Sequence, residues 1–281
     1  MMRDPGDPAL FAAIARATRD ALAEAEVNLP RDVIAALEQA RSRERNPVAR
    51  GELDQILANV ALAAERNAPL CQDTGVPVVY VTLPPEIACT FSLYRAVEEG
   101  VRRATREVPL RPNVVDPLTR KNTGDNTGPG IPAVHVRPGN EFRITVLPKG
   151  AGAENVSRLG MLLPTEAGTI PRFVTETVLL AGGRPCPPVI LGVGIGGTFD
   201  GAAALAKEAL LLPIDSMDQY EQAICDAVNT LGIGPMGLGG DTTALAVKVR
   251  RSACHTASLP VAVNVQCWAA RRASRVVEVP P

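Results

Sequence analysis

Aromatic residues are scarce in this sequence of 281 residues: they make up 3% of the chain, whereas hydrophobic residues make up 46%. The core must therefore consist mainly of Ala, Val, Leu and Ile side chains, and the length suffices for one large domain or two small ones. No apolar run approaches the roughly 18 residues that span a bilayer, and the opening MMRDPGDPAL lacks the apolar segment of a signal peptide. We expect a soluble cytoplasmic protein.

The sequence also lacks an excess of either charge and any Cys-x-x-Cys pair. A formal net charge of -1 gives no electrostatic reason to expect nucleic acid or an anionic membrane as a partner. In a reducing compartment the six cysteines would be buried thiols, a nucleophile or metal ligands. Without closely spaced pairs, a metal site would have to be assembled from distant segments.

Hydrophobic periodicity predicts an α+β fold, with a helical N-terminal segment (1–66) and a mixed α/β body (67–281) that together form one compact domain. A long irregular stretch at 108–132 is too well surrounded by strand-like sequence to be disordered, so a functional loop is expected there. The remaining expectations are helices over 8–26, 31–44, 49–67, 91–107, 169–182, 200–212 and 217–232, a glycine loop that leads into a strand over 232–250, and strands over 77–83, 133–138, 142–148, 188–193 and 259–267, the last half-buried with Val261, Val263 and Val265 on one face.

The segment PCPPVILGVGIGG contains Gly192-x-Gly194-x-x-Gly197, which has the spacing of a dinucleotide-binding loop. Such a unit needs a second strand and an acidic residue about 20 positions on. Asp215 has a suitable position, but the helix expected up to Leu212 leaves only Pro213 and Ile214 for the strand. The dinucleotide interpretation is therefore disfavoured, and the glycines are expected to form tight turns with exposed amides.

Three cysteines have surroundings that suit a metal ligand. Cys71 opens the turn-like sequence CQDTG, Cys186 lies among prolines in RPCPP, and Cys267 ends an expected strand. Cys89 and Cys225 lie in apolar-patterned segments and are expected to be small core residues. A buried structural thiol remains the alternative for each of the three.

Six ordered motifs together resemble one family. They are CQDTG (71–75), NTGDNTGP (122–129), PKGAGAEN (148–155), GGRPCPPVILGVGIGGT (182–198), LGIGPMGLGGDTTAL (231–245) and HTASLPVAVNVQCWAARRA (255–273). The family is the class I, iron–sulfur-dependent fumarate hydratase and L-tartrate dehydratase family, and the chain resembles its separate α subunit. The resemblance implies a [4Fe–4S] cluster held by Cys71, Cys186 and Cys267, with one iron not ligated by the protein. It does not imply a ligand role for Cys254.

The resemblance also implies residues that act on substrate. Gln72 and Asp73 would contact it, and His255, with Asp73, would pass a proton to the leaving hydroxide. Arg111 would clamp a carboxylate, and the turn at 150–152 would offer backbone amides, with Gly152 as the candidate. This turn reads GAG where the family often has GGG. A turn histidine bonded to backbone and an ordinary surface arginine remain the alternatives for His255 and Arg111.

In single-chain relatives a further C-terminal domain supplies the general base and more carboxylate-binding groups, whereas this sequence stops at Pro281. The resemblance therefore implies a β subunit, an α2β2 assembly and an active site between unlike chains. The expected activity is that of a hydro-lyase, hydrating fumarate to malate reversibly. The alternatives are an L-tartrate dehydratase α subunit, a non-catalytic iron–sulfur scaffold protein and, least favoured, a nicotinamide-dependent enzyme.

Overall fold

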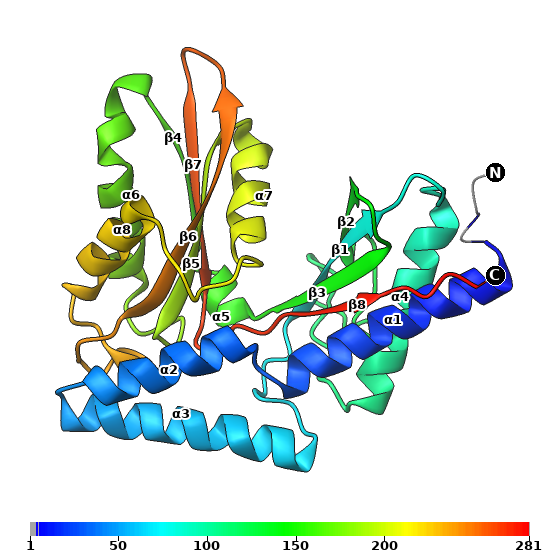
Figure 1. Ribbon diagram of the computed structural model, residues 1–281, viewed down its shortest axis with the longest axis horizontal. Coiled ribbons are helices and arrows are strands. Elements are labelled where there is room, and N and C mark those ends of the chain that lie inside the picture. Colours follow the sequence, from blue (N-terminus) through cyan, green and yellow to red (C-terminus); the bar gives the residue numbers. More distant parts are fainter. Residues whose placement is uncertain (1–3, 5, 281) are drawn as a thin grey trace. The chain divides into compact units, whose positions relative to one another are not determined.

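The computed structural model describes residue 4 and residues 6–280, and these fall into two compact units. The first unit takes in the chain up to Pro30, Val60–Gly150 and the segment from Arg271 onward, and the second takes in Arg31–Asn59 and Ala151–Ala270. Each unit contains helices and a four-stranded mixed sheet (Figure 1). The expected α+β fold is therefore confirmed. No helix of the described residues is long and apolar enough to cross a membrane.

The sheet of the first unit has the order β2-β1-β3-β8, with β1 parallel to β2 and the other neighbours antiparallel. Helices α1 and α4 pack together on one face, where they cover Val79, Val81, Ile144 and Val146. Gly100 allows the close approach of the two helices, because a Cβ there would lie 2.5 Å from the Cβ of Thr18. The elements are α1 (Pro8–Val27), β1 (Val76–Leu83), α4 (Phe91–Glu107), β2 (Ala133–Pro138), β3 (Arg143–Lys149) and β8 (Ala273–Val276).

The sheet of the second unit has the order β4-β7-β5-β6, with β5 parallel to β6 and antiparallel to β7. Helix α7 covers one face, and α6 and α8 cover the other (Figure 1). The elements are α2 (Arg31–Arg43), α5 (Ala151–Glu154), β4 (Arg158–Leu162), a 3₁₀ segment (Pro164–Thr169), α6 (Ile170–Ala181), β5 (Val189–Gly197), α7 (Phe199–Ala209), α8 (Gln219–Asn229), a second 3₁₀ segment (Pro235–Gly237), β6 (Ala244–Cys254) and β7 (Leu259–Gln266). Helix α3 (Pro47–Arg66) contributes residues to both units.

The expected helices and strands are present with small shifts in their ends, but the prediction of a half-buried last strand is wrong. Every residue of β7 after Leu259 is buried, because β4 and β5 flank it and helices lie on both faces. Val261, Val263 and Val265 do share one face and join the core with α6 and α8. The opposite face presents Ala262 to Ala202 and Ala206 of α7.

The interpretation of the glycines at 192–197 as turns is also wrong for Gly192 and Gly194. Both lie inside β5, between β6 and β7, so their backbone groups belong to the sheet. A Cβ at Gly192 would lie 2.1 Å from the Ala206 carbonyl oxygen, and one at Gly194 would lie 2.1 Å from that of Ala202. These glycines let α7 pack directly against the strand, which accounts for their spacing without any nucleotide.

Candidate functional site

The CQDTG turn lies in the first unit, between α3 and β1. Asp73 shapes it, because its Oδ1 accepts a hydrogen bond from the Gly75 N–H over 2.9 Å. Gly75 has φ +73° and packs against the end of β3, where a Cβ would lie 2.7 Å from the Lys149 carbonyl carbon. At the start of the turn, the Leu70 N–H donates to the Glu26 carbonyl oxygen over 2.8 Å. Cys71 is half-buried in this turn, and the neighbouring Gln72 is exposed.

A buried ion pair supports the same turn. Arg271 donates from Nη1 to the Glu26 carboxylate over 2.5 Å and from Nη2 to the Asp73 carbonyl oxygen over 2.8 Å. The side chains of Arg271 and Glu26 are 1% and 0% exposed. Burial raises the pKa of Glu26 to about 7 although Arg271 opposes the shift. Neither residue was assigned a role from the sequence. The only signal was the position of Arg271 just beyond Cys267.

The glycine turn after β3 approaches the Asp73 side chain through Gly150. A Cβ at Gly150 would lie 3.1 Å from Asp73 Oδ2 and 3.8 Å from Arg271 Nη2. The predicted substrate-binding residue, Gly152, lies in α5 of the second unit and is exposed. Gly150 is thus the glycine of the 150–152 turn that the structure places against Asp73.

Arg111 has an exposed side chain on a backbone that is tied to the CQDTG turn. Its carbonyl oxygen accepts a hydrogen bond from Thr74 Oγ1 over 3.1 Å. Asn113 Nδ2 donates to Thr74 Oγ1 and to the Gly75 carbonyl oxygen, each over 3.1 Å. The structure therefore brings together the segments that carry Asp73 and Arg111, two of the residues that the sequence indicated.

The second unit holds Cys186 and Cys267 on adjoining backbone segments. Cys186 is exposed and has φ +52°, an uncommon conformation for a residue other than glycine. Its carbonyl oxygen accepts a hydrogen bond from the Trp268 N–H over 3.3 Å, so the end of β7 lies beside the RPCPP segment. Cys267 is half-buried. Two of the three predicted cluster ligands are thus close in the fold although 81 positions separate them.

His255 is exposed in the turn between β6 and β7. Its Nδ1 accepts a hydrogen bond from the Ala257 N–H over 3.1 Å, and its carbonyl oxygen accepts one from the Ser258 N–H over 3.1 Å. Since Nδ1 acts as an acceptor, the proton of the neutral ring lies on Nε2. The backbone bond is the one expected of a turn histidine, and the ring still presents an N–H donor through its other nitrogen.

The other cysteines differ in their surroundings. Cys225 is buried in the core of the second unit, where burial raises the pKa of its thiol to about 12. The prediction of a core position is wrong for Cys89, which is exposed, because it precedes α4 instead of lying within it. Among the described residues, no group of three or more His, Cys, Asp and Glu side chains is arranged to hold a metal ion.

Comparison with known proteins extends the resemblance to nearly the whole chain. The family model "Fumarate hydratase (Fumerase)" matches residues 15–276. The chain belongs to this family of hydro-lyases. A protein of Methanocaldococcus jannaschii, provisionally named L(+)-tartrate dehydratase subunit alpha, is 45% identical over 269 residues, which cover 91% of this chain and 94% of that protein. The L(+)-tartrate dehydratase subunit alpha of Escherichia coli O157:H7 is 33% identical over 260 residues, covering 89% of this chain and 86% of the relative.

In this member of the fumarate hydratase family, the residues indicated by the sequence are divided between the two units. Cys71, Gln72, Asp73 and Arg111 belong to the first unit, and Gly152, Cys186, His255 and Cys267 belong to the second. The first set surrounds a turn fixed by buried hydrogen bonds. In the second set, His255 and Cys267 directly follow strands β6 and β7, Cys186 lies in the loop before β5, and Gly152 lies in α5.

Proposed function

We propose that the chain is the α subunit of a [4Fe–4S]-dependent hydro-lyase that adds water to, or removes it from, a C4 dicarboxylate. The observation that carries the proposal is the location of Asp73 and Arg111 on segments joined through Thr74, next to a half-buried thiol at Cys71. Such an arrangement offers a carboxylate, a cation and a metal-ligating sulfur within one short stretch of the fold.

Two substrates are candidates. The names of the relatives, L(+)-tartrate dehydratase subunit alpha, favour L(+)-tartrate, which would lose water to give oxaloacetate. The family description favours the reversible hydration of fumarate to malate. Both substrates carry two carboxylates on a four-carbon chain, so the same cationic groups serve either one.

The donor set of Cys71, Cys186 and Cys267 fits an iron–sulfur cluster. Thiolate is the ligand that such clusters use, and all three thiols are exposed or half-buried. Cys225 does not fit, because its buried thiol has a pKa raised to about 12. When bound through three thiolates, the cluster would supply a Lewis-acidic iron for the substrate hydroxyl.

The side chains of this chain would orient the substrate and move one proton. Arg111 binds a substrate carboxylate through its guanidinium, for which a two-point contact is the preferred geometry. Gln72 offers an amide donor from the CQDTG turn. In the dehydration direction the C–O bond breaks, and His255 in its imidazolium form gives the proton of Nε2 to the departing hydroxide, so that water forms and the ring becomes neutral. The imidazolium also carries a proton on Nδ1, so it gives up the Ala257 N–H bond of the neutral ring. Asp73 would stabilise the imidazolium before the transfer. A base on the β subunit takes the proton from the neighbouring carbon.

The subunit names of the relatives support a separate β subunit, and we propose an α2β2 enzyme with the α chain in the cytoplasm. A reducing compartment suits a chain with six thiols.

Anaerobic reconstitution with iron and sulfide tests the proposal. We expect about four irons per chain, with cluster absorption lost in the single variants Cys71→Ser, Cys186→Ser and Cys267→Ser and kept in Cys89→Ser. Turnover of L(+)-tartrate or fumarate should require the β subunit. If the folded wild-type chain binds no iron under anaerobic conditions, the proposed cluster is refuted. Turnover by the α chain alone would refute the need for a partner.

A further inference from the structure

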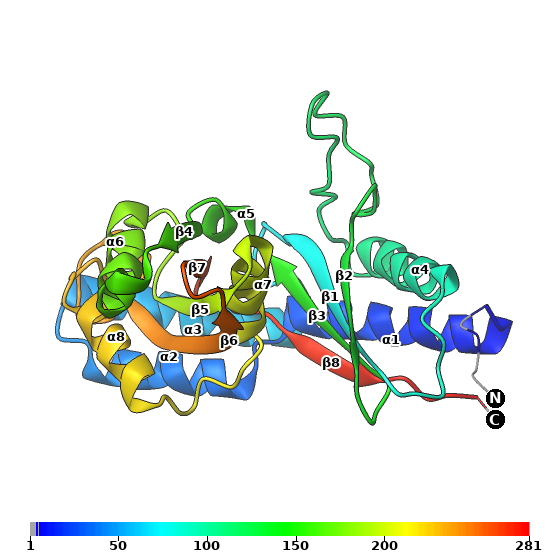
Figure 2. The same ribbon diagram turned by 90° about the horizontal axis from the view of Figure 1, so that it is seen from above.

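The segment NTGDNTGP belongs to the long loop 108–132, which projects away from α4 and β2 in Figure 2. Most side chains between Asp116 and Gly124 are exposed, but Asn126 is only 2% exposed. Asn126 also has φ +61°, a conformation that asparagine tolerates better than most residues because its short side chain can bond locally. A buried amide needs hydrogen-bond partners.

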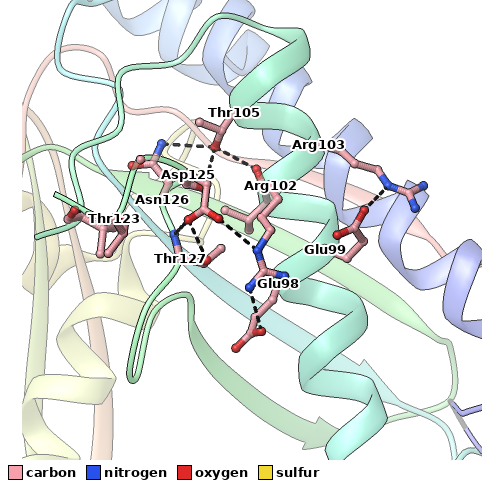
Figure 3. Close-up of polar contacts among 12 residues, drawn as sticks. Glu98, Glu99, Arg102, Arg103, Thr105, Thr123, Asp125, Asn126 and Thr127 are labelled. Atoms are coloured by element: carbon pink, nitrogen blue, oxygen red, sulfur yellow. Dashed lines mark hydrogen bonds and ion pairs between the residues drawn. The ribbon is translucent and has the colours of Figure 1, made fainter.

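The Asn126 side chain finds these partners on both sides of Pro112. Its Oδ1 accepts a hydrogen bond from the Asn113 N–H over 2.6 Å, and its Nδ2 donates to the Arg111 carbonyl oxygen over 2.9 Å. Nδ2 also lies 3.3 Å from Thr105 Oγ1 of α4, and Figure 3 shows the amide directed toward that threonine. One side chain therefore joins the backbone of the Arg111–Asn113 segment to the helix.

The same segment is bonded on its other side to the CQDTG turn. The Arg111 carbonyl oxygen accepts from both Asn126 and Thr74, and the Asn113 side chain reaches Thr74 and Gly75. A continuous hydrogen-bonded network thus runs from α4 through Asn126 and Arg111 to the turn that carries Asp73. Each of its members lies in the first unit.

We propose that Asn126 is a positioning residue for Arg111, a proposal that rests on the carboxylate-binding role proposed above for that arginine. The long Arg111 side chain is exposed, so its usefulness as a clamp depends on a fixed backbone. A displacement of about 1 Å in a substrate-binding group can cost roughly a hundredfold in rate. An amide is required at position 126 because only a side chain with both an acceptor and donors serves the Asn113 N–H and the Arg111 carbonyl oxygen together.

Asn126→Asp is the most informative variant. It keeps the size of the side chain and its tolerance of positive φ, but the carboxylate has no donor for the Arg111 carbonyl oxygen. Asn126→Gly is the second variant, since glycine adopts φ +61° easily and removes the amide. We expect either variant, in the reconstituted αβ enzyme, to raise KM about tenfold with a smaller change in kcat. Iron content and cluster absorption should stay at the wild-type level, because the thiols are unchanged.

Asp125→Asn is the matched control. Asp125 anchors the same loop to α4 by accepting from Arg102 Nε over 3.1 Å, and its other carboxylate oxygen accepts from the N–H and the hydroxyl of Thr127 (Figure 3). This control should lower the melting temperature slightly and leave KM unchanged. A rise in KM for Asp125→Asn as large as that for Asn126→Asp would overturn the proposal, since general loosening of the loop would then explain both.

Two further measurements separate this inference from the proposed function. Succinate, a C4 dicarboxylate that cannot react, should bind Asn126→Asp about tenfold more weakly in calorimetry with the loaded enzyme. In an Arg111→Ala background, Asn126→Asp should cause no additional loss, because the group that it positions is gone. If Arg111→Ala leaves KM and succinate binding unchanged, the proposed role of Arg111 fails. If Arg111→Ala changes both but Asn126→Asp and Asn126→Gly change neither, only the positioning role fails.

Discussion

Arg271 holds the backbone of Asp73 by a hydrogen bond of 2.8 Å from Nη2 to the carbonyl oxygen, although 198 positions separate the two residues. The guanidinium is buried and also binds the carboxylate of Glu26, at the end of α1. Since the Glu26 carbonyl oxygen accepts from the Leu70 N–H, the same pair holds the CQDTG turn at Asp73 and at the residue just before Cys71. We therefore expect this pair to help fix the position of Cys71.

Removal of one partner of this pair should be costly. We expect Arg271→Met to lower the free energy of unfolding by about 3–5 kcal/mol, because it leaves the Glu26 carboxylate buried without its counter-charge. The double variant Glu26→Met/Arg271→Met should recover most of that loss, since no charge then remains buried. Urea unfolding of the wild type and the three variants measures the cycle.

The exposed pair of Arg103 and Glu99, drawn in Figure 3, gives the control. Arg103→Met should change the free energy of unfolding by about 0.5 kcal/mol or less, as is typical of exposed pairs on a helix. Equal losses in the free energy of unfolding for Arg271→Met and Arg103→Met would show that the buried pair contributes no more to stability than the exposed pair.

The raised pKa of Glu26 predicts how stability depends on pH. Its value changes from 4.5 to about 7 on folding, chiefly through burial, so between these values the folded chain holds a proton that the unfolded chain has lost. The corresponding stabilisation is complete below about pH 4.5 and is lost as the pH rises through 7. We therefore expect the wild type to lose stability relative to Glu26→Gln between pH 5 and pH 8, as followed by urea unfolding at several pH values. If the wild type instead gains stability relative to Glu26→Gln over this pH range, the effect of Arg271 on the pKa of Glu26 is larger than the effect of burial.

Local patterns sufficed for the elements but not for the contacts between distant segments. Helix α4 follows from apolar residues at three- and four-residue spacing, such as Leu93, Val97 and Val101, all of which are buried. The local sequence around Glu26, by contrast, does not distinguish it from any other acidic residue near the end of a helix. Only the folded chain shows that it meets Arg271, because that contact spans 245 positions.

The site was predictable to a similar extent. The resemblance named Asp73 and Arg111, and the structure joins their segments through Thr74. Neither Asn126 nor Gly150 could be assigned a role in advance, since a loop sequence does not show which of its amides is buried or which glycine of a turn meets a carboxylate. Strands β4 and β8 were missed because both are short and show no clear alternation of buried and exposed residues.

The packing of α7 on β5 predicts that alanine is not tolerated at two glycines. In Gly192→Ala and Gly194→Ala the new Cβ would lie 2.1 Å from a helix carbonyl oxygen, so strand or helix must move. We expect each to lower the free energy of unfolding by about 3 kcal/mol, the upper end of ordinary overpacking.

Gly51→Ala is the control, because nothing lies within 4 Å of its added Cβ and the position is helical. It should stabilise the chain by about 0.5–1 kcal/mol. Wild-type stability in Gly192→Ala would contradict the close packing.

The thiols provide a test of burial and of the proposed cluster in one experiment. In the cluster-free chain at pH 8, iodoacetamide should label the exposed Cys89, Cys186 and Cys254 readily, with mass spectrometry of peptides as the readout. Cys225 should react only after unfolding, because a pKa of about 12 leaves about one thiol in ten thousand as thiolate and the core excludes the reagent.

The same labelling after anaerobic loading with iron and sulfide should distinguish ligands from bystanders. Cys186 should become protected together with Cys71 and Cys267, whereas Cys89 and Cys254 should react as before. Protection of Cys254 in place of Cys267 would show that Cys267 is not the third ligand of the cluster. Protection of all the exposed cysteines alike would indicate non-specific binding of iron, because a bound cluster protects only the cysteines that ligate it.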